Sequence, residues 1–117
     1  MKALIILTII GITACSTSRP LIPNQESEKL AEEYRVNPNE AVIELKIQEV
    51  ESKDGNHLIT AKVVRVTKIS FGFKQVNENQ VLTIVSDVKL NKDDQVFALM
   101  DYYQQQSGPE YSLRKIF

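Results

Sequence analysis

The sequence predicts an all-β fold, a small five-stranded antiparallel barrel or a sandwich, with one short helix before the first strand. Three observations support this prediction. Apolar and polar residues alternate from Ile43 to Gln48, as in a strand with one wet face. An Asp54-Gly55 pair, a strong signal for a tight hairpin, follows that strand. Beyond it, short apolar runs alternate with turn residues, which favours barrels and sandwiches.

The region before the first strand divides into a tether and a helix. Residues 15–26 include two prolines and many polar side chains, so we expect an extended, flexible linker. Residues 27–35 are expected to form a short helix with Ser27 as its N-cap. Leu30 and Tyr34 fall on one face of this helix, which predicts that the face packs on the main domain.

Residues 27–117 are predicted to form one domain whose first hairpin is long and bent. Its first strand covers 41–50, and a break in the alternation at Val50 predicts a bulge there. The return strand covers 57–69, and Val64 and Val66 are expected to face away from the earlier apolar residues. A long strand that changes its buried face is usually bent, and bent strands close small barrels.

Three further strands complete the predicted domain. The first of them is apolar on both faces, so we expect it to lie in the middle of the sheet. A polar turn with Asp93 and Asp94 precedes the next strand, and a loop with Gly108 and Pro109 precedes the last. The three strands are expected at residues 81–85, 96–103 and 111–117, and the second loop at 104–110.

The N-terminus has the features of a secretory signal. Lys2 precedes an apolar run over residues 3–12, which is about half the length that spans a bilayer as a helix. The run ends in Ile12-Thr13-Ala14-Cys15, which resembles the lipobox of bacterial lipoproteins. The resemblance implies cleavage between Ala14 and Cys15, so that residues 1–14 are a signal peptide. It also implies a diacylglycerol on the Cys15 thiol and a fatty acid such as palmitate on its amine.

The implied anchor also suggests a location. Two or three acyl chains on one residue hold a protein stably on a membrane. In enteric-type lipoproteins, an aspartate after the lipidated cysteine tends to retain the protein in the inner membrane. Ser16 occupies that position here. The resemblance therefore implies the outer membrane, facing the periplasm, in preference to the inner membrane.

The layout of the mature domain resembles OB-type barrels, and in particular the netrin-like variety. The resemblance lies in the early helix, a first strand at 41–50, a second strand carrying Val63-Val64-Arg65-Val66, and a turn at 90–96 that leads into an apolar strand. Netrin-like domains usually contain several disulfides, whereas a chain with one cysteine can form none within itself. Transthyretin-like and immunoglobulin-like sandwiches remain alternatives.

Composition and charge narrow the classes of function. The chain has 117 residues, enough for a single domain. Its hydrophobic content of 43% and charged content of 25% are ordinary for a globular protein. The formal net charge is −1, and no basic cluster is present. Nucleic-acid binding is therefore disfavoured, because it usually needs a basic excess on one face.

No motif for catalysis, a metal or a cofactor is present, so we expect a protein that is not an enzyme and binds no cofactor. His57 is the only histidine and follows a tight turn, which favours a solvated hairpin residue over a metal ligand. A second cluster of possible ligands for calcium consists of Asp87, Asn91, Asp93 and Asp94. Their spacing does not match an EF-hand loop, so a polar turn is favoured over a calcium site.

Aromatic residues near loops are the best candidates for a binding surface. The candidate surface consists of Phe71, Phe73, Tyr102 and Tyr103, with Tyr111 a further aromatic of the same region. The two phenylalanines flank a glycine and are expected to point the same way. The two adjacent tyrosines must face opposite sides of a strand, so one of them faces outward. Core packing is the favoured interpretation for most of these side chains, and partner binding is the alternative.

Two functions fit these features. The first is a membrane-anchored, non-enzymatic interaction module whose partner is another envelope protein. The second is an OB-like module that binds an envelope glycan or peptidoglycan in a groove lined by residues such as Phe73 and Tyr102. The second interpretation rests on analogy between folds.

Overall fold

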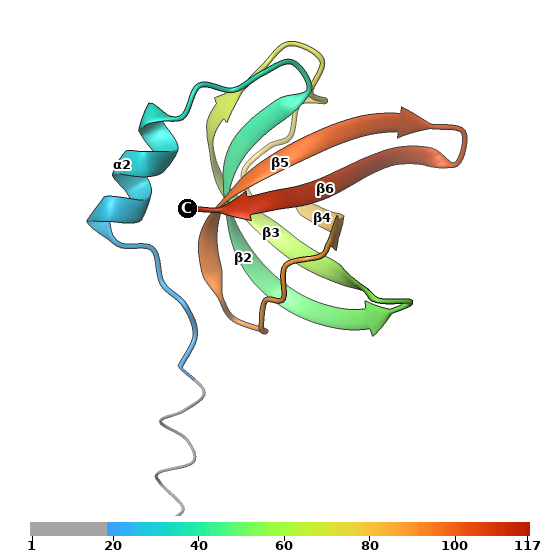
Figure 1. The fold of residues 1–117 in the computed structure, drawn as a ribbon, viewed down its shortest axis with the longest axis horizontal. Coiled ribbons are helices and arrows are strands. Elements are labelled where there is room, and N and C mark those ends of the chain that lie inside the picture. Colours follow the sequence, from blue (N-terminus) through green and yellow to red (C-terminus); the bar gives the residue numbers. More distant parts are fainter. Residues whose placement is uncertain (1–18) are drawn as a thin grey trace, which may run out of the picture.

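The computed structural model describes residues 19–117, so the predicted signal peptide, Ala14 and Cys15 lie outside the described residues. One helix precedes five strands (Figure 1). The elements are α2 (Gln25–Glu33), β2 (Glu40–Lys53), β3 (Asn56–Ile69), β4 (Val81–Ser86), β5 (Gln95–Gln105) and β6 (Gly108–Ile116). Within residues 19–117, no helix is long and apolar enough to cross a membrane.

The five strands form a closed barrel in the order β2-β3-β4-β6-β5 (Figure 1). The predicted barrel is therefore confirmed, and a sandwich is excluded. The pairs are antiparallel except for β4 with β6, where Ile84 lies opposite Tyr111 in a parallel pairing. The expectation of a wholly antiparallel sheet is wrong at this pair, because β6 returns from the β5–β6 hairpin in the direction of β4.

The hairpin of β2 and β3 is long and bent, as the sequence predicts. Asp54 and Gly55 turn the chain with φ values of 53° and 83°, the positive values that such tight turns need. Three register shifts interrupt the pairing of β2 with β3, and one lies between Ile47 and Glu49, close to the predicted bulge. Because bulges reset the alternation of faces, Val66 packs on the interior core and the prediction that it faces away is wrong.

The barrel has one core inside and a smaller one outside. Inside, large side chains from the barrel strands, and one from the segment before β5, are fully buried, among them Ile43, Leu45, Ile47, Ile59, Ile84, Leu90 and Met100. Outside, side chains of β2 and β5 meet α2 in a second cluster, formed by Ala31, Val42, Phe97 and Leu99. The strands under the helix are therefore apolar on both faces.

Helix α2 lies against the outside of the barrel and begins earlier than predicted (Figure 1). Its N-cap is Asn24 and the prediction of Ser27 is wrong, because the Asn24 side chain accepts a hydrogen bond from the Ser27 amide at 2.8 Å. Asparagine is one of the best N-cap residues. Tyr34, expected inside the helix, is its C-cap and packs edge-on against Phe117 with 5.5 Å between ring centroids.

Arg65 of β3 ties the helix to the barrel. Its guanidinium pairs with Glu28 of α2 at 2.7 Å and with Glu44 of β2 at 2.9 Å. The same group lies 5.4 Å from the ring centroid of Phe97. The hydrogen bonds to Glu28 and Glu44 raise the pKa of Arg65 above its usual value, so this side chain holds its charge between the two carboxylates.

The chain before α2 is also attached to the barrel. The Leu21 amide donates to the Asp94 carboxylate at 2.9 Å, and the Leu21 carbonyl accepts from the Gln95 amide at 2.8 Å. Asp94 is buried, and its other oxygen accepts from the Asn91 amide at 2.8 Å. Leu21 lies inside the predicted tether 15–26, so the barrel holds the tether at this point.

The β5–β6 hairpin is longer than predicted. Residues 104–110, expected as a loop, continue the ladder until Gln105 lies opposite Gly108. Side chains 104–107 are exposed, so no alternation of burial marks this part as strand in the sequence. The hairpin projects from the barrel body (Figure 1).

Candidate functional site

The four residues of the predicted binding surface are not equivalent in the structure. Phe71 is 92% exposed, whereas Phe73 is only 6% exposed. Tyr102 is partly buried, and Tyr103 is 49% exposed on the opposite face of β5. The expectation that Phe71 and Phe73 point the same way is wrong, because the chain turns at Gly72.

Phe73 belongs to an aromatic cluster at the edge of the interior core. Its ring centroid lies 5.9 Å from that of Tyr102 and 5.8 Å from that of Tyr111, and the two tyrosines are 5.4 Å apart. Tilted contacts at these distances are favourable for aromatic rings. Burial raises the pKa of Tyr111 above its usual value. Because Phe73 is buried by its neighbours, its face is not open for stacking on a sugar.

Phe71 stands on a compact turn, residues 70–73, which we call the Phe71 turn. Gly72 has φ +94°, and a Cβ atom at this position would clash with the side-chain oxygen Oδ1 of Asn39. The backbone conformation favours glycine here, and any larger residue would also force the Asn39 side chain to move. Asn39 itself has φ 69°, in the left-handed region that asparagine tolerates.

Backbone hydrogen bonds fix the position of the Phe71 turn. The Asn39 amide donates to the Phe71 carbonyl at 2.9 Å, and the Asn39 carbonyl accepts from the Tyr102 amide at 3.0 Å. The Ser70 amide donates to the Glu40 carbonyl at 3.0 Å, and the Glu40 amide donates to the Ser70 hydroxyl at 3.0 Å. The exposed ring of Phe71 is thus carried by a backbone that is held on the barrel.

An ionic cluster of two buried carboxylates and the exposed Arg114 lies next to this turn. The Glu40 carboxylate accepts from the Asn37 amide at 2.8 Å and from the Arg114 guanidinium at 2.9 Å. Arg114 also contacts the Asp101 carboxylate at 3.3 Å. Burial raises the pKa of Asp101, Arg114 lowers it, and the neighbouring Glu40 raises it, with a net rise above the usual value. Two buried carboxylates thus share one arginine.

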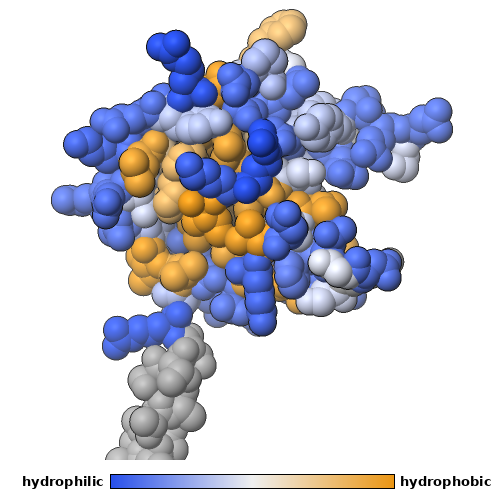
Figure 2. Space-filling view, viewed as in Figure 1, coloured by the Kyte–Doolittle hydropathy of each residue, from blue (hydrophilic) through white to orange (hydrophobic). Residues whose placement is uncertain are grey.

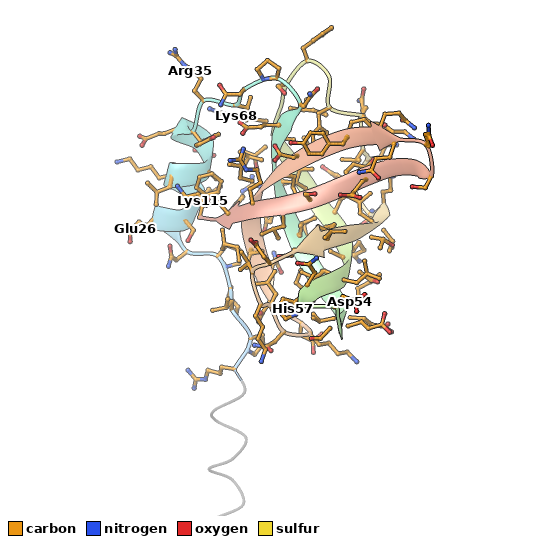
Figure 3. The ribbon with its side chains drawn as sticks, turned by 45° about the vertical axis from the view of Figure 1, so that its right-hand side comes forward. Glu26, Arg35, Asp54, His57, Lys68 and Lys115 are labelled. Carbon is orange, nitrogen blue, oxygen red and sulfur yellow. The ribbon has the colours of Figure 1, made fainter. Side chains whose placement is uncertain are left out.

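The single histidine is remote from this site. Figure 3 places His57 and Asp54 together at the hairpin end of β2 and β3, with Lys68 and Arg35 at the other end of the molecule. The His57 Nδ1 lies 3.2 Å from the Ser52 hydroxyl. Among residues 19–117, no group of three or more histidine, cysteine or acidic residues is arranged to hold a metal ion. Asp94, considered for calcium, instead holds the Leu21 and Asn91 amides.

Two open cavities lie on either side of α2. One, of about 540 Å³, is lined by residues 22–24, which precede the helix, together with Glu44, Arg65 and Phe97. Its arginine is already paired with two carboxylates. The other, of about 330 Å³, is more apolar and is lined by Leu30 and Phe117 among others. Figure 2 shows hydrophobic surface on this face of the molecule.

Several residues of the site were not identified from the sequence. Asn39 and Glu40 hold the Phe71 turn although they lie about 30 residues before it in the chain. The nearest sequence signals are Gly72, which marks a loop, and the Asn37-Pro38-Asn39 string, which ends a helix. Neither signal indicates that these two segments touch.

Comparison with known proteins gives no assignment. No protein-family model matches the sequence, and no curated protein matches it significantly.

Proposed function

We propose that this chain is a bacterial envelope lipoprotein. In this proposal residues 1–14 are removed, Cys15 carries the lipid, and the protein lies on the outer membrane facing the periplasm. The support is the lysine at position 2, the short apolar run at 3–12, the Ile12-Thr13-Ala14-Cys15 sequence and the serine that follows. A residue bearing two or three acyl chains is a stable anchor.

We further propose that the barrel is a non-enzymatic protein-interaction module and that the Phe71 turn is its contact. The observation that carries this proposal is a phenylalanine that is 92% exposed on a turn with a fixed backbone. Aromatic side chains are enriched at the centres of interfaces. A fixed backbone loses little conformational freedom on binding, so more of the contact energy appears as affinity.

The partner that fits this turn is an envelope protein with an apolar pocket and a polar rim. Exposed polar side chains are close to Phe71: Lys74 and Gln75 follow it in the sequence, and the Asn39 amide bonds to its carbonyl. Burying a phenylalanine side chain stabilises a complex by about 1.5–3 kcal/mol, equivalent to about tenfold to a hundredfold in affinity. Interface cores of this kind are apolar with polar surroundings.

The test is purification of the tagged protein from membranes after crosslinking in cells. Four forms are compared: wild type, Phe71→Ala, the exposed-surface control Val81→Ala, and Cys15→Ser. We expect one discrete envelope protein with wild type and Val81→Ala, its loss with Phe71→Ala, and reduced recovery with Cys15→Ser. Equal recovery with Phe71→Ala would exclude the turn as the contact.

The anchor is tested separately by mass spectrometry of the N-terminal peptide. We expect a peptide that begins at Cys15 and carries the mass of the acyl chains. An unmodified Cys15, or a mature chain that begins at another residue, contradicts the lipoprotein proposal without affecting the interpretation of the barrel.

A further inference from the structure

Two large aliphatic side chains are exposed side by side where the described chain begins. Leu21 is 53% exposed and Ile22 is 74% exposed. Within residues 19–117 they are the only exposed large hydrophobic residues that are adjacent in sequence. Figure 2 shows hydrophobic surface close to the point where the grey chain leaves the molecule. Contiguous exposed apolar surface is a feature of sites that bind proteins or membranes.

The backbone that presents this pair is fixed. Leu21 is held through both its amide and its carbonyl, by the buried Asp94 carboxylate and by the Gln95 amide. Pro20 and Pro23 flank the pair, and proline restricts the backbone at both positions. The exposure of the two side chains is therefore a property of the folded barrel and is not that of a loose chain end.

The pair lies at the end of the barrel opposite the Phe71 turn. Leu21 bonds to Gln95, which lies opposite Lys46 of β2. The Phe71 turn bonds to Asn39, seven residues earlier along the chain. With a rise of about 3.3 Å per residue, the two points are separated by about 23 Å. Figure 1 shows the blue chain entering at the bottom and the yellow segment after β3 at the top.

We propose that Leu21 and Ile22 make a second contact with the membrane, by inserting into the interface of the bilayer that holds the lipid of Cys15. This inference rests on the anchor proposed above. Leu21 is the sixth residue after Cys15, and six residues span at most about 20 Å. The covalent chain therefore keeps the pair close to the bilayer, and interfacial apolar side chains enter it by about 5–10 Å.

Charges near the pair favour the same contact. Arg19 is exposed and lies two residues before Leu21 in the sequence. Lys92 is also exposed and lies two residues before Asp94, whose carboxylate bonds to the Leu21 amide. Cations next to a membrane are attracted by anionic headgroups. Asp93 is also exposed there and offsets one of these charges. The aliphatic pair, and not the charge, carries the contact.

Two attachments at one end orient the barrel. The Phe71 turn then points away from the membrane, into the aqueous compartment. Its partner is therefore a protein that reaches it from that compartment, and not an integral protein embedded beside it in the same bilayer.

The chain contains no tryptophan, so single-tryptophan variants report depth in the membrane. The full lipidated protein is purified as Ile22→Trp, as Phe71→Trp and as the side-surface control Val81→Trp. Each is reconstituted on vesicles of phosphatidylethanolamine and phosphatidylglycerol, with and without bromine on the acyl chains close to the glycerol. Flotation of the vesicles is recorded for every sample, and far-UV circular dichroism checks the fold.

We expect all three variants to float, with emission from Ile22→Trp shifted to the blue and reduced at least twofold by the brominated lipid. Phe71→Trp and Val81→Trp should show no change. Protein that floats while Ile22→Trp is not quenched overturns the second contact but leaves the anchor intact. Equal quenching of Phe71→Trp overturns the orientation. Protein that does not float overturns the anchor, and the inference with it.

Discussion

Phe71 and Phe73 are two residues apart, yet replacing them by alanine should change the stability of the fold to very different extents. Phe73 is 6% exposed and its ring contacts those of Tyr102 and Tyr111. Truncating a buried phenylalanine costs about 3–5 kcal/mol, because apolar contact is lost and a cavity remains. Phe71 is 92% exposed, and substitutions at such positions change stability by no more than about 0.5 kcal/mol.

These magnitudes are large compared with the stability of a domain of this size, about 5–15 kcal/mol. Phe73→Ala should lower the melting temperature by more than about 10 °C, whereas Phe71→Ala should change it by only a few degrees. The assay is urea and thermal unfolding of a chain that begins at Ser16, and far-UV circular dichroism monitors the unfolding. A loss of stability in Phe71→Ala as large as that in Phe73→Ala would refute the exposed-ring argument.

Three further predictions concern the surroundings of the site. Gly72→Ala should lower the free energy of unfolding by about 1–3 kcal/mol and weaken partner binding although Phe71 is unchanged. Adding Asn39→Gly should restore part of the lost stability. Unchanged midpoints of urea unfolding would contradict this prediction. Because the pKa of Asp101 is raised in the fold, its ionisation destabilises the protein, so Asp101→Asn should gain stability relative to wild type as the pH rises from about 3 to about 6. A difference in unfolding free energy that does not vary with pH would refute that assignment. Asp94→Ala should speed hydrogen exchange of the Leu21 amide more than tenfold, as measured by mass spectrometry. An unchanged rate would mean that the carboxylate does not hold the segment before α2.

Much of the barrel could be predicted because half-buried strands carry a period of two. That signal marks β2 and β3, and the Asp54-Gly55 pair fixes the turn between them. The signal fails at residues 104–107, where the hairpin projects and both faces meet water. The parallel pairing of β4 with β6 was also missed, since strand direction follows from barrel closure and not from local sequence.

The candidate site was only partly predictable for a related reason. Exposed aromatics could be proposed from their positions near loops, but the opposite directions of Phe71 and Phe73 depend on the turn at Gly72. The ion pair between the buried Glu40 carboxylate and the exposed Arg114 joins residues 74 positions apart, and no spacing rule connects them. Contacts of this kind appear only when the barrel has closed.

The most direct test of the account is photo-crosslinking from a single position in living cells. A photoreactive phenylalanine analogue replaces Phe71 in the full chain, and the same analogue at the exposed Val81 of β4 is the control. The account predicts one discrete crosslinked envelope protein from position 71, weaker in the Cys15→Ser chain and absent from position 81. The same products from both positions, or no product from position 71, would contradict the proposal that this turn is the contact of a membrane-anchored interaction module.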